Sequence, residues 1–301
     1  MIKQEINELK RLYTPSNCSI TRICGCYVDG EKNKKTEFKE AFLSLPEEEI
    51  FKYFELLRKT LSGSLGKNLL NLDFPLASEQ EGGTQAALLA LRDSKLKDDA
   101  LIEEFYDRVI NTYEYVGNYL ILLIHDAYDV PGKTTDGLTM DDASDTVFEY
   151  IMCCICPVNL SKPGLSYDNI NNEFHNRIRD WVVEMPETGF LFPSFNDRAT
   201  DIHSTLFYSK NPEEAHSEFV ENILGCTMPL SAGTQKEAFQ ALIEETLGDE
   251  VEYEVVKNIH ENLTEMIEEH KEIPEPLTLD KHQVKSLFEK SGVKEEKMTD
   301  F

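Results

Sequence analysis

The residues best suited to chemistry form the polar run Asn196-Asp197-Arg198-Ala199-Thr200-Asp201-Ile202-His203-Ser204-Thr205. In a strand, Asp201 and His203 would share one face, where a histidine beside a carboxylate can act as a general base. Arg198 can bind a phosphate or a carboxylate. These are parts of a hydrolase for phosphate-containing substrates, but no nucleophile accompanies them at a recognised spacing. Turn caps at a strand end, with a surface salt bridge, explain the same residues. Four more polar side chains lie shortly upstream and would extend the cluster: Glu173, His175, Arg177 and Arg179.

Cysteine pairs offer a second kind of chemistry. Cys24 with Cys26, and Cys154 with Cys156, each place two thiols on one strand face. If the strands pair, the four thiolates can bind zinc or an iron–sulfur cluster. The usual zinc knuckle, however, separates its cysteines by at least two residues within a turn, and small buried hydrophobic residues explain these thiols more simply. We therefore expect no metal, no cofactor and free thiols in a reducing cytoplasm.

Charge limits the possible partners. The chain carries 56 acidic and 30 basic side chains, a formal net charge of −26, and so repels polyphosphates unless its cations gather on one face. One such group surrounds a predicted turn and is the candidate DNA-binding patch, with Arg22 as a further cation. Its members are Lys32, Lys34, Lys35 and Lys39. A solvated turn is the alternative interpretation of the same lysines.

The acidic residues concentrate towards the C-terminus. From Pro212 to Phe301 there are 22 Asp or Glu residues against 8 Lys or Arg, a net charge of −14. This segment either is a solvated face or offers an acidic surface to a basic protein. An acidic protein-interaction scaffold is thus a further hypothesis.

The elements that must position these residues begin with a helix over residues 2–13 and a strand over 20–28, whose Asp29-Gly30 turn predicts a hairpin. Three helical segments follow: one begins at 47, the second follows the glycines at 82–83, and the third spans 98–116. Two apolar runs, 119–127 and 147–156, show little alternation and predict central strands covered on both faces. Further strands are expected over 177–183 and 190–195.

The C-terminal part is predicted to be helical. Asn211-Pro212 begins a helix that Gly225 ends, and Thr234 to Glu237 matches a capping box for a helix that ends at Gly248. A long helix begins at Asp249, and a last one, capped by Asp280, ends at Gly292. The predicted fold is α+β: a mostly antiparallel central sheet flanked by helices, followed by an acidic helical part. Two domains are expected, an α+β domain over residues 1–210 and an acidic helical region over residues 211–301, with a proline linker near 273–279.

Three segments resemble an uncharacterised bacterial family known only as a domain of unknown function. They are residues 20–30 (ITRICGCYVDG), 156–162 (CPVNLSK) and 190–198 (FLFPSFNDR). The resemblance spans nearly the whole chain and implies no activity, because that family carries none.

The order of elements also resembles the NdpA-type nucleoid-associated proteins. The shared layout is an early hairpin, a helix near 47–62, central strands, and a strand–helix–Leu–Gly segment that includes Phe219 to Gly225. This resemblance implies a binding role at the bacterial chromosome, and it carries over no functional residue.

The resulting hypothesis is a cytoplasmic, nucleoid-associated-like binding protein without catalytic activity. Its expected partner is DNA, contacted through the lysine patch, or a basic DNA-associated protein. No membrane contact is expected, because the longest apolar run, residues 119–124, is far shorter than the ~20 residues of a membrane helix. The hydrolase and the acidic scaffold are the alternatives. The sequence leaves open the oligomeric state and whether a natural chain continues beyond Phe301.

Overall fold

The computed structural model describes residues 1–133, 139–140, 146–214, 216–229, 232–247, 253–270 and 277–293. The chain divides into two compact units, Met1–Met228 and Pro229–Phe301. The division lies after Met228 rather than after residue 210, because Phe219 and Leu224 are still buried in a core of the first unit. The predicted proline linker lies partly outside the described residues.

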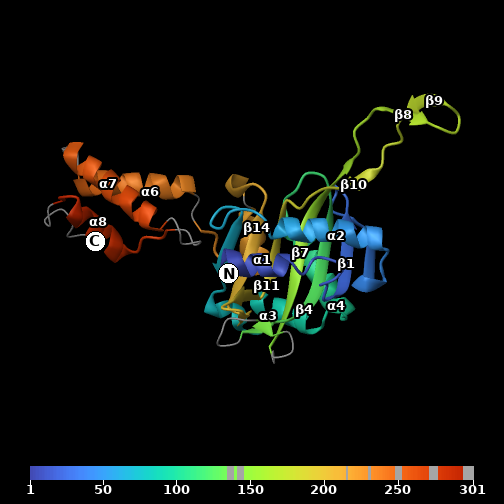
Figure 1. Ribbon diagram of the computed structural model, residues 1–301, viewed down its shortest axis with the longest axis horizontal. Helices are drawn as coiled ribbons and strands as arrows, with labels where there is room; N and C mark the ends of the chain where they lie inside the picture. The colour runs from blue at the N-terminus through green and yellow to red at the C-terminus, as the bar shows by residue number, and fades with distance from the viewer. Residues whose placement is uncertain are drawn as a thin grey trace. The chain divides into compact units, whose positions relative to one another are not determined.

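The first unit is built on one large antiparallel sheet, in the strand order β2-β1-β4-β7-β11-β14-β3, with β10 also paired to β7 (Figure 1). Its strands are β1 Ile20–Val28, β2 Lys34–Ala41, β3 Leu69–Asp73, β4 Asn118–Asp129, β7 Val147–Leu160, β10 Trp181–Val183, β11 Thr188–Phe192 and β14 Ser204–Ser209. Three small hairpins pair β5 Gly132–Lys133 with β6 Thr139–Met140, β8 Leu165–Asp168 with β9 Glu173–Asn176, and β12 Ser194–Asn196 with β13 Ala199–Asp201.

Helices cover both faces of this sheet. The helices of the first unit are α1 Lys3–Lys10, α2 Glu47–Thr60, α3 Thr84–Asp93, α4 Asp99–Thr112 and α5 Ser217–Phe219, which runs into a π-helical turn, Val220–Leu224. Short 3-10 turns span Phe42–Ser44, Leu76–Glu79 and Pro212–Glu214.

Alternation along the central strand β4 divides the interior into two cores. Leu122 and Ile124 pack with Phe54 of α2 in one core. Ile121 and Leu123 point to the other face and pack with residues of α3 and α4. The unit therefore has three layers: α1 and α2, the sheet, then α3, α4 and α5. This confirms the predicted α+β class with its mostly antiparallel central sheet.

The second unit is a small helical bundle. Its helices are α6 Ala232–Leu247, α7 Tyr253–His270 and α8 Lys281–Lys290. Ile259, Leu287 and Phe288 form its buried centre. The predicted cap is confirmed, since the Asp280 carboxylate accepts a hydrogen bond from the Gln283 amide at 2.7 Å. The predicted boundaries at Gly248 and Asp249 lie outside the described residues.

Some predicted elements differ from the observed ones. The run 177–183 forms a strand only at β10, and the run 190–195 divides at Pro193 into β11 and β12, because proline has no amide proton for the sheet. The helix expected from Pro212 to Gly225 is broken into three short turns, although Gly225 does end it, with a left-handed φ of 73°. The strands β3 and β14 were not predicted.

The central sheet is closely packed around Gly189, and a substitution at this residue tests that packing. A Cβ on this residue would lie 2.4 Å from the Cys153 carbonyl oxygen and 2.9 Å from Cγ2 of Thr60. We expect Gly189→Ala to lower the free energy of unfolding by about 1–3 kcal/mol, because backbone atoms must move apart. Gly164→Ala is the matched control, since nothing lies within 4 Å of its added Cβ. Urea denaturation of both variants checks this, and an equal stability of the two would contradict it.

Candidate functional site

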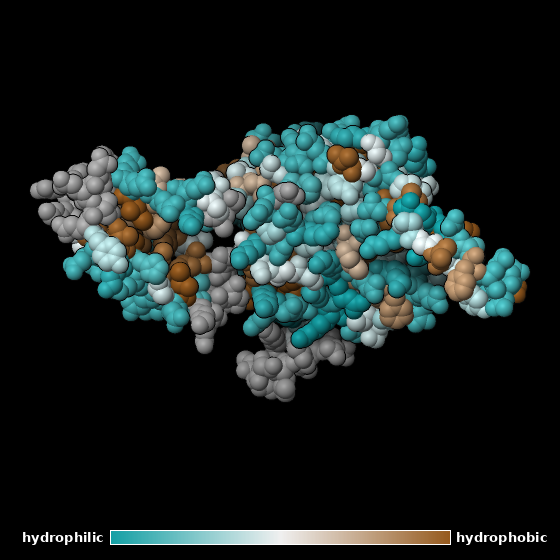
Figure 2. All heavy atoms as spheres, turned by 90° about the horizontal axis from the view of Figure 1, so that it is seen from above, coloured by the Kyte–Doolittle hydropathy of each residue, from teal (hydrophilic) through white to brown (hydrophobic). Residues whose placement is uncertain are grey.

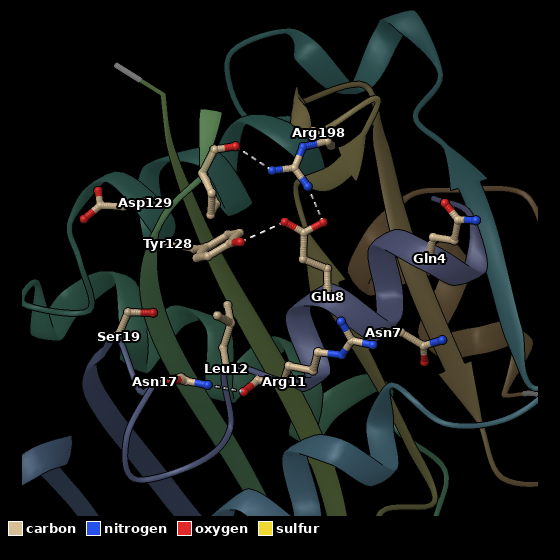
Figure 3. A pocket seen from close by; sticks show the side chains of 11 residues that line it. Gln4, Asn7, Glu8, Arg11, Leu12, Asn17, Ser19, Tyr128, Asp129 and Arg198 are labelled. Carbon is tan, nitrogen blue, oxygen red and sulfur yellow. Dashed lines mark hydrogen bonds and ion pairs between the residues drawn. The ribbon is translucent and has the colours of Figure 1, made fainter. Parts of the chain in front are cut away.

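A cavity of about 820 Å³ opens beside α1 and includes Arg198, the predicted anion clamp. Its wall comes from α1, the segment after it, the end of β4 and the β12–β13 turn (Figure 3). The lining residues are Gln4, Asn7, Glu8, Arg11, Leu12, Asn17, Ser19, Tyr128, Asp129, Pro131 and Arg198. The wall is therefore mostly polar, with charges of both signs.

The Glu8 carboxylate is at the centre of the hydrogen bonds in this cavity. Figure 3 shows it between Tyr128 and Arg198. The Tyr128 hydroxyl donates to Oε1 of Glu8 at 2.8 Å, and the Arg198 guanidinium pairs with Oε2. The second guanidinium nitrogen of Arg198 donates to the Pro131 carbonyl at 2.8 Å. Arg198 is thus already neutralised and joins the β12–β13 turn to α1.

Other polar groups of the wall remain available. In the described residues the Arg11 guanidinium has no ion-pair partner, and the side-chain amide of Asn17 donates to the Arg11 carbonyl at 3.3 Å. A guanidinium with neighbouring amides can hold a small anionic group. No histidine lines the cavity, and the carboxylate beside the Ser19 hydroxyl is that of the buried Asp126, whose pKa is raised by burial. The Arg11 guanidinium and the amides beside it therefore suit the binding of a small anionic group.

The other two predicted catalytic residues do not join Arg198. The Asp201 carboxylate accepts hydrogen bonds from the Ser204 hydroxyl at 2.8 Å, from Asn196 at 2.6 Å and from the His203 amide at 3.0 Å. Although partial burial opposes it, these bonds lower the pKa of Asp201. The His203 ring turns away and pairs with Glu79 at 2.7 Å. Asp201 and His203 thus stabilise the turn and its surroundings and do not form a general-base pair.

The four upstream residues are also elsewhere. Glu173 and His175 lie on β9, and Arg177 and Arg179 follow it in the projecting β8–β9 hairpin (Figure 1). They are therefore part of a different surface from Arg198.

The predicted lysine patch is largely neutralised within the fold. Three of its lysines pair with carboxylates: Lys34 with Glu103 at 2.6 Å and Asp107 at 2.8 Å, Lys35 with Asp29 at 2.7 Å, and Lys39 with Asp99 at 3.0 Å. Lys32 lies exposed in the hairpin turn with a left-handed φ of 63°. DNA binding here would have to compete with these carboxylates for each paired cation.

The cysteines of the candidate metal site lie on opposite faces of the sheet. Cys24 and Cys26 belong to the core under α4, whereas Cys154 and Cys156 belong to the core under α1 and α2. Burial raises the pKa of Cys26 and of Cys154 to about 12, which keeps both thiols protonated. The four sulfurs cannot meet, and no metal-ligand cluster of His, Cys, Asp or Glu occurs among the described residues.

Two buried ionisable neighbours on β4 were missed by the sequence analysis. His125 is fully buried, with Nδ1 2.7 Å from the Thr21 hydroxyl and Nε2 without a hydrogen bond. Asp126 points to the other face and accepts from the Tyr150 hydroxyl at 2.7 Å, which lies 3.0 Å from the Tyr13 hydroxyl. Burial lowers the pKa of His125 to about 4 and raises that of Asp126. Their position directly after an apolar run was the only signal in the sequence.

The family model described as "Domain of unknown function (DUF4317)" matches residues 1–301. The chain belongs to this family. No curated protein and no solved structure matches it. The predicted resemblance to the uncharacterised family is thus confirmed, whereas nothing found here shows the NdpA-type resemblance.

Membership of the DUF4317 family assigns no activity to this chain. The function must therefore be inferred from the arrangement of its side chains. Among the described residues, no helix is long and apolar enough to cross a membrane.

His125 predicts a pH dependence of stability. Its pKa is about 4 when folded and about 6.5 when unfolded. As pH falls from 6.5 to 4, the unfolded chain takes up a proton that the folded chain does not, so stability falls by up to about 1.4 kcal/mol per pH unit. We expect His125→Asn to flatten this slope relative to wild type. His203→Asn is the control, because His203 is exposed. Urea denaturation from pH 4 to 7 measures both, and an unchanged slope in His125→Asn would refute the assignment.

Because three of the four patch lysines are held in ion pairs, we expect no DNA binding at micromolar protein concentration. We expect no change in the fluorescence anisotropy of a labelled DNA duplex with micromolar protein at about 50 mM salt, where electrostatic attraction is strong. Two results together would instead establish DNA binding by the lysine patch. The wild type would bind the duplex with an affinity that falls steeply with salt, and the double variant Lys34→Glu with Lys35→Glu would bind it more weakly. Lys52→Glu is the control, as an exposed lysine on α2 outside the patch.

Proposed function

We propose that this chain is a non-enzymatic binding protein that acts through a protein partner, which it contacts with the β8–β9 hairpin. The observation that carries the proposal is the placement of apolar surface. In the described parts of the chain, nine of the eighteen large hydrophobic side chains that are exposed fall within residues 160–184. We call this segment the arm. It projects from the body of the first unit (Figure 1).

The arm has an ordered local structure. Its base is β10, paired with the end of β7 through Trp181 and Leu160. Its tip is a turn in which the Asp168 carboxylate accepts from the Ile170 amide at 2.8 Å and from the Asn171 side chain at 2.7 Å. An isolated two-stranded hairpin is marginally stable in water, so a second surface would stabilise this one.

One face of the arm is apolar. Tyr167 and Phe174 are cross-strand partners whose ring centroids lie 5.3 Å apart, and Leu165 shares their face by alternation. These three side chains are 54%, 71% and 72% exposed. Hydrophobic residues reach the surface along this segment, at the right end of the view in Figure 2. Several large exposed apolar side chains on one short segment are typical of protein–protein contact sites.

The magnitudes favour a contact along the whole arm. Complete burial of one large apolar side chain contributes about 1.5–3 kcal/mol, and association costs about 4–15 kcal/mol in lost freedom. Three such side chains contribute about 4.5–9 kcal/mol, which leaves little net stabilisation after this cost. The remaining exposed apolar residues must contribute as well: Leu160, Ile170, Ile178, Trp181, Val182 and Val183.

The chemistry of the other candidate sites supports binding rather than catalysis. Arg198, Asp201 and His203 each have separate structural partners. The nucleoid role and the acidic scaffold formed by residues 212–301 stay predictions, and deletion of the scaffold segment followed by a pull-down with a basic protein tests the latter.

Photo-crosslinking tests the proposal. We expect p-benzoylphenylalanine at Phe174, introduced in the native host, to give a discrete protein adduct that mass spectrometry identifies. The same reporter at Val116, which is fully exposed on the body, is the control and should not give this adduct. The adduct must form again from purified proteins and disappear in the Ile170→Asp variant. Absence of any arm-specific adduct would exclude a protein partner for the arm.

A further inference from the structure

The arm differs in charge from the chain that carries it. Residues 160–184 contain three Lys or Arg and four Asp or Glu, a net charge of −1, so the remaining residues carry a net charge of −25. Its three cations are Lys162, Arg177 and Arg179, and none of them has an ion pair in the described residues, unlike Lys34, Lys35 and Lys39. The arm therefore presents unpaired cations beside exposed apolar side chains. The arm also carries four carboxylates without an ion pair in the described residues: Asp168, Glu173, Asp180 and Glu184. Arg177 and Arg179 lie together after β9, and a surface complementary to these two cations would be acidic and partly apolar.

The chain itself offers such a surface at the start of α2. Leu43 and Phe51 are exposed there, by 66% and 43%. Between them, Glu47, Glu48 and Glu49 are exposed and have no ion pair among the described residues. The apolar pair can pack against the apolar face of the arm, and the carboxylates can pair with the cations of the arm.

From these features we infer that the occupant of the arm is a second copy of this chain. Each copy would lay its arm on the Leu43–Phe51 surface of its partner, in a reciprocal two-fold exchange. This inference rests on the proposed function, since it names the partner for the same surface. A two-fold dimer makes the same contact twice and closes, which satisfies both arms at once.

The size of the arm agrees with this assembly. It contains twenty-five residues, and a standard interface takes about 20–30 residues from each partner. Two arms would bring two such contacts. Outside the arm each chain carries a net charge of −25, so two copies repel each other. Contact through the nearly neutral arm lowers this electrostatic cost.

Sedimentation or light scattering of the full chain tests the dimer. We expect wild type to have twice the chain mass at micromolar concentration. Phe174→Asp with Ile178→Asp should raise the dimer dissociation constant at least about thirtyfold, the effect of losing a strong interface anchor. Val116→Asp should leave the dimer intact, since it places the same charge on an exposed apolar site of the body. Circular dichroism shows whether each variant is folded. A monomeric wild type, or a dimer that the arm variant leaves unchanged, would overturn the inference.

A charge swap tests the acceptor surface. Arg177→Glu with Arg179→Glu should weaken the dimer, and addition of Glu48→Lys with Glu49→Lys in the same chain should restore it. Lack of restoration would rule out α2 as the acceptor. If the protein is monomeric and its arm still crosslinks to a different protein, the inference of a second copy is overturned and the proposed function is supported. A monomer without any arm adduct would overturn both.

Discussion

The pairing of β4 with β7 is the constraint on which the rest of the structure depends. The two strands pair without interruption from Asn118–Val158 to Asp129–Val147. Both are apolar on both faces, so the sheet must be covered on each side. The helices before them in the chain supply both covers, with α1 and α2 on one side and α3 and α4 on the other. The other strands of the large sheet extend this pair outward.

The same pair explains why the arm stands where it does. β7 runs for 14 residues, whereas its neighbour β11 has only five. The last part of β7 therefore extends past β11, and β10 pairs with it there. The chain between β7 and β10 has no further sheet to join and forms its own hairpin. Its apolar face remains exposed within the first unit.

Local pairing of charges moderates the large acidic excess. Lys34 bridges from the β1–β2 hairpin to α4, and Arg198 bridges from the β12–β13 turn to α1. These cations hold elements together and are thereby less available to an outside polyanion. The unpaired cations of the arm are different, because they stand beside exposed apolar side chains. Binding through the arm and structural use of the other cations are thus complementary parts of one charge distribution.

By itself the sequence determined the elements whose signals are local. The bounds of β1, the cores of β4 and β7, the helices α2 and α4 and the cap at Asp280 follow from periodicity, turn residues and capping within a few positions. Only the tertiary structure decided which groups meet. Strand register placed Cys24 and Cys154 on opposite faces of the sheet. Arg198 forms an ion pair with Glu8, which is far away in the sequence, and so does not join the predicted catalytic group. Such contacts, and the burial that shifts the pKa of His125, arise from non-local packing, which no short pattern encodes.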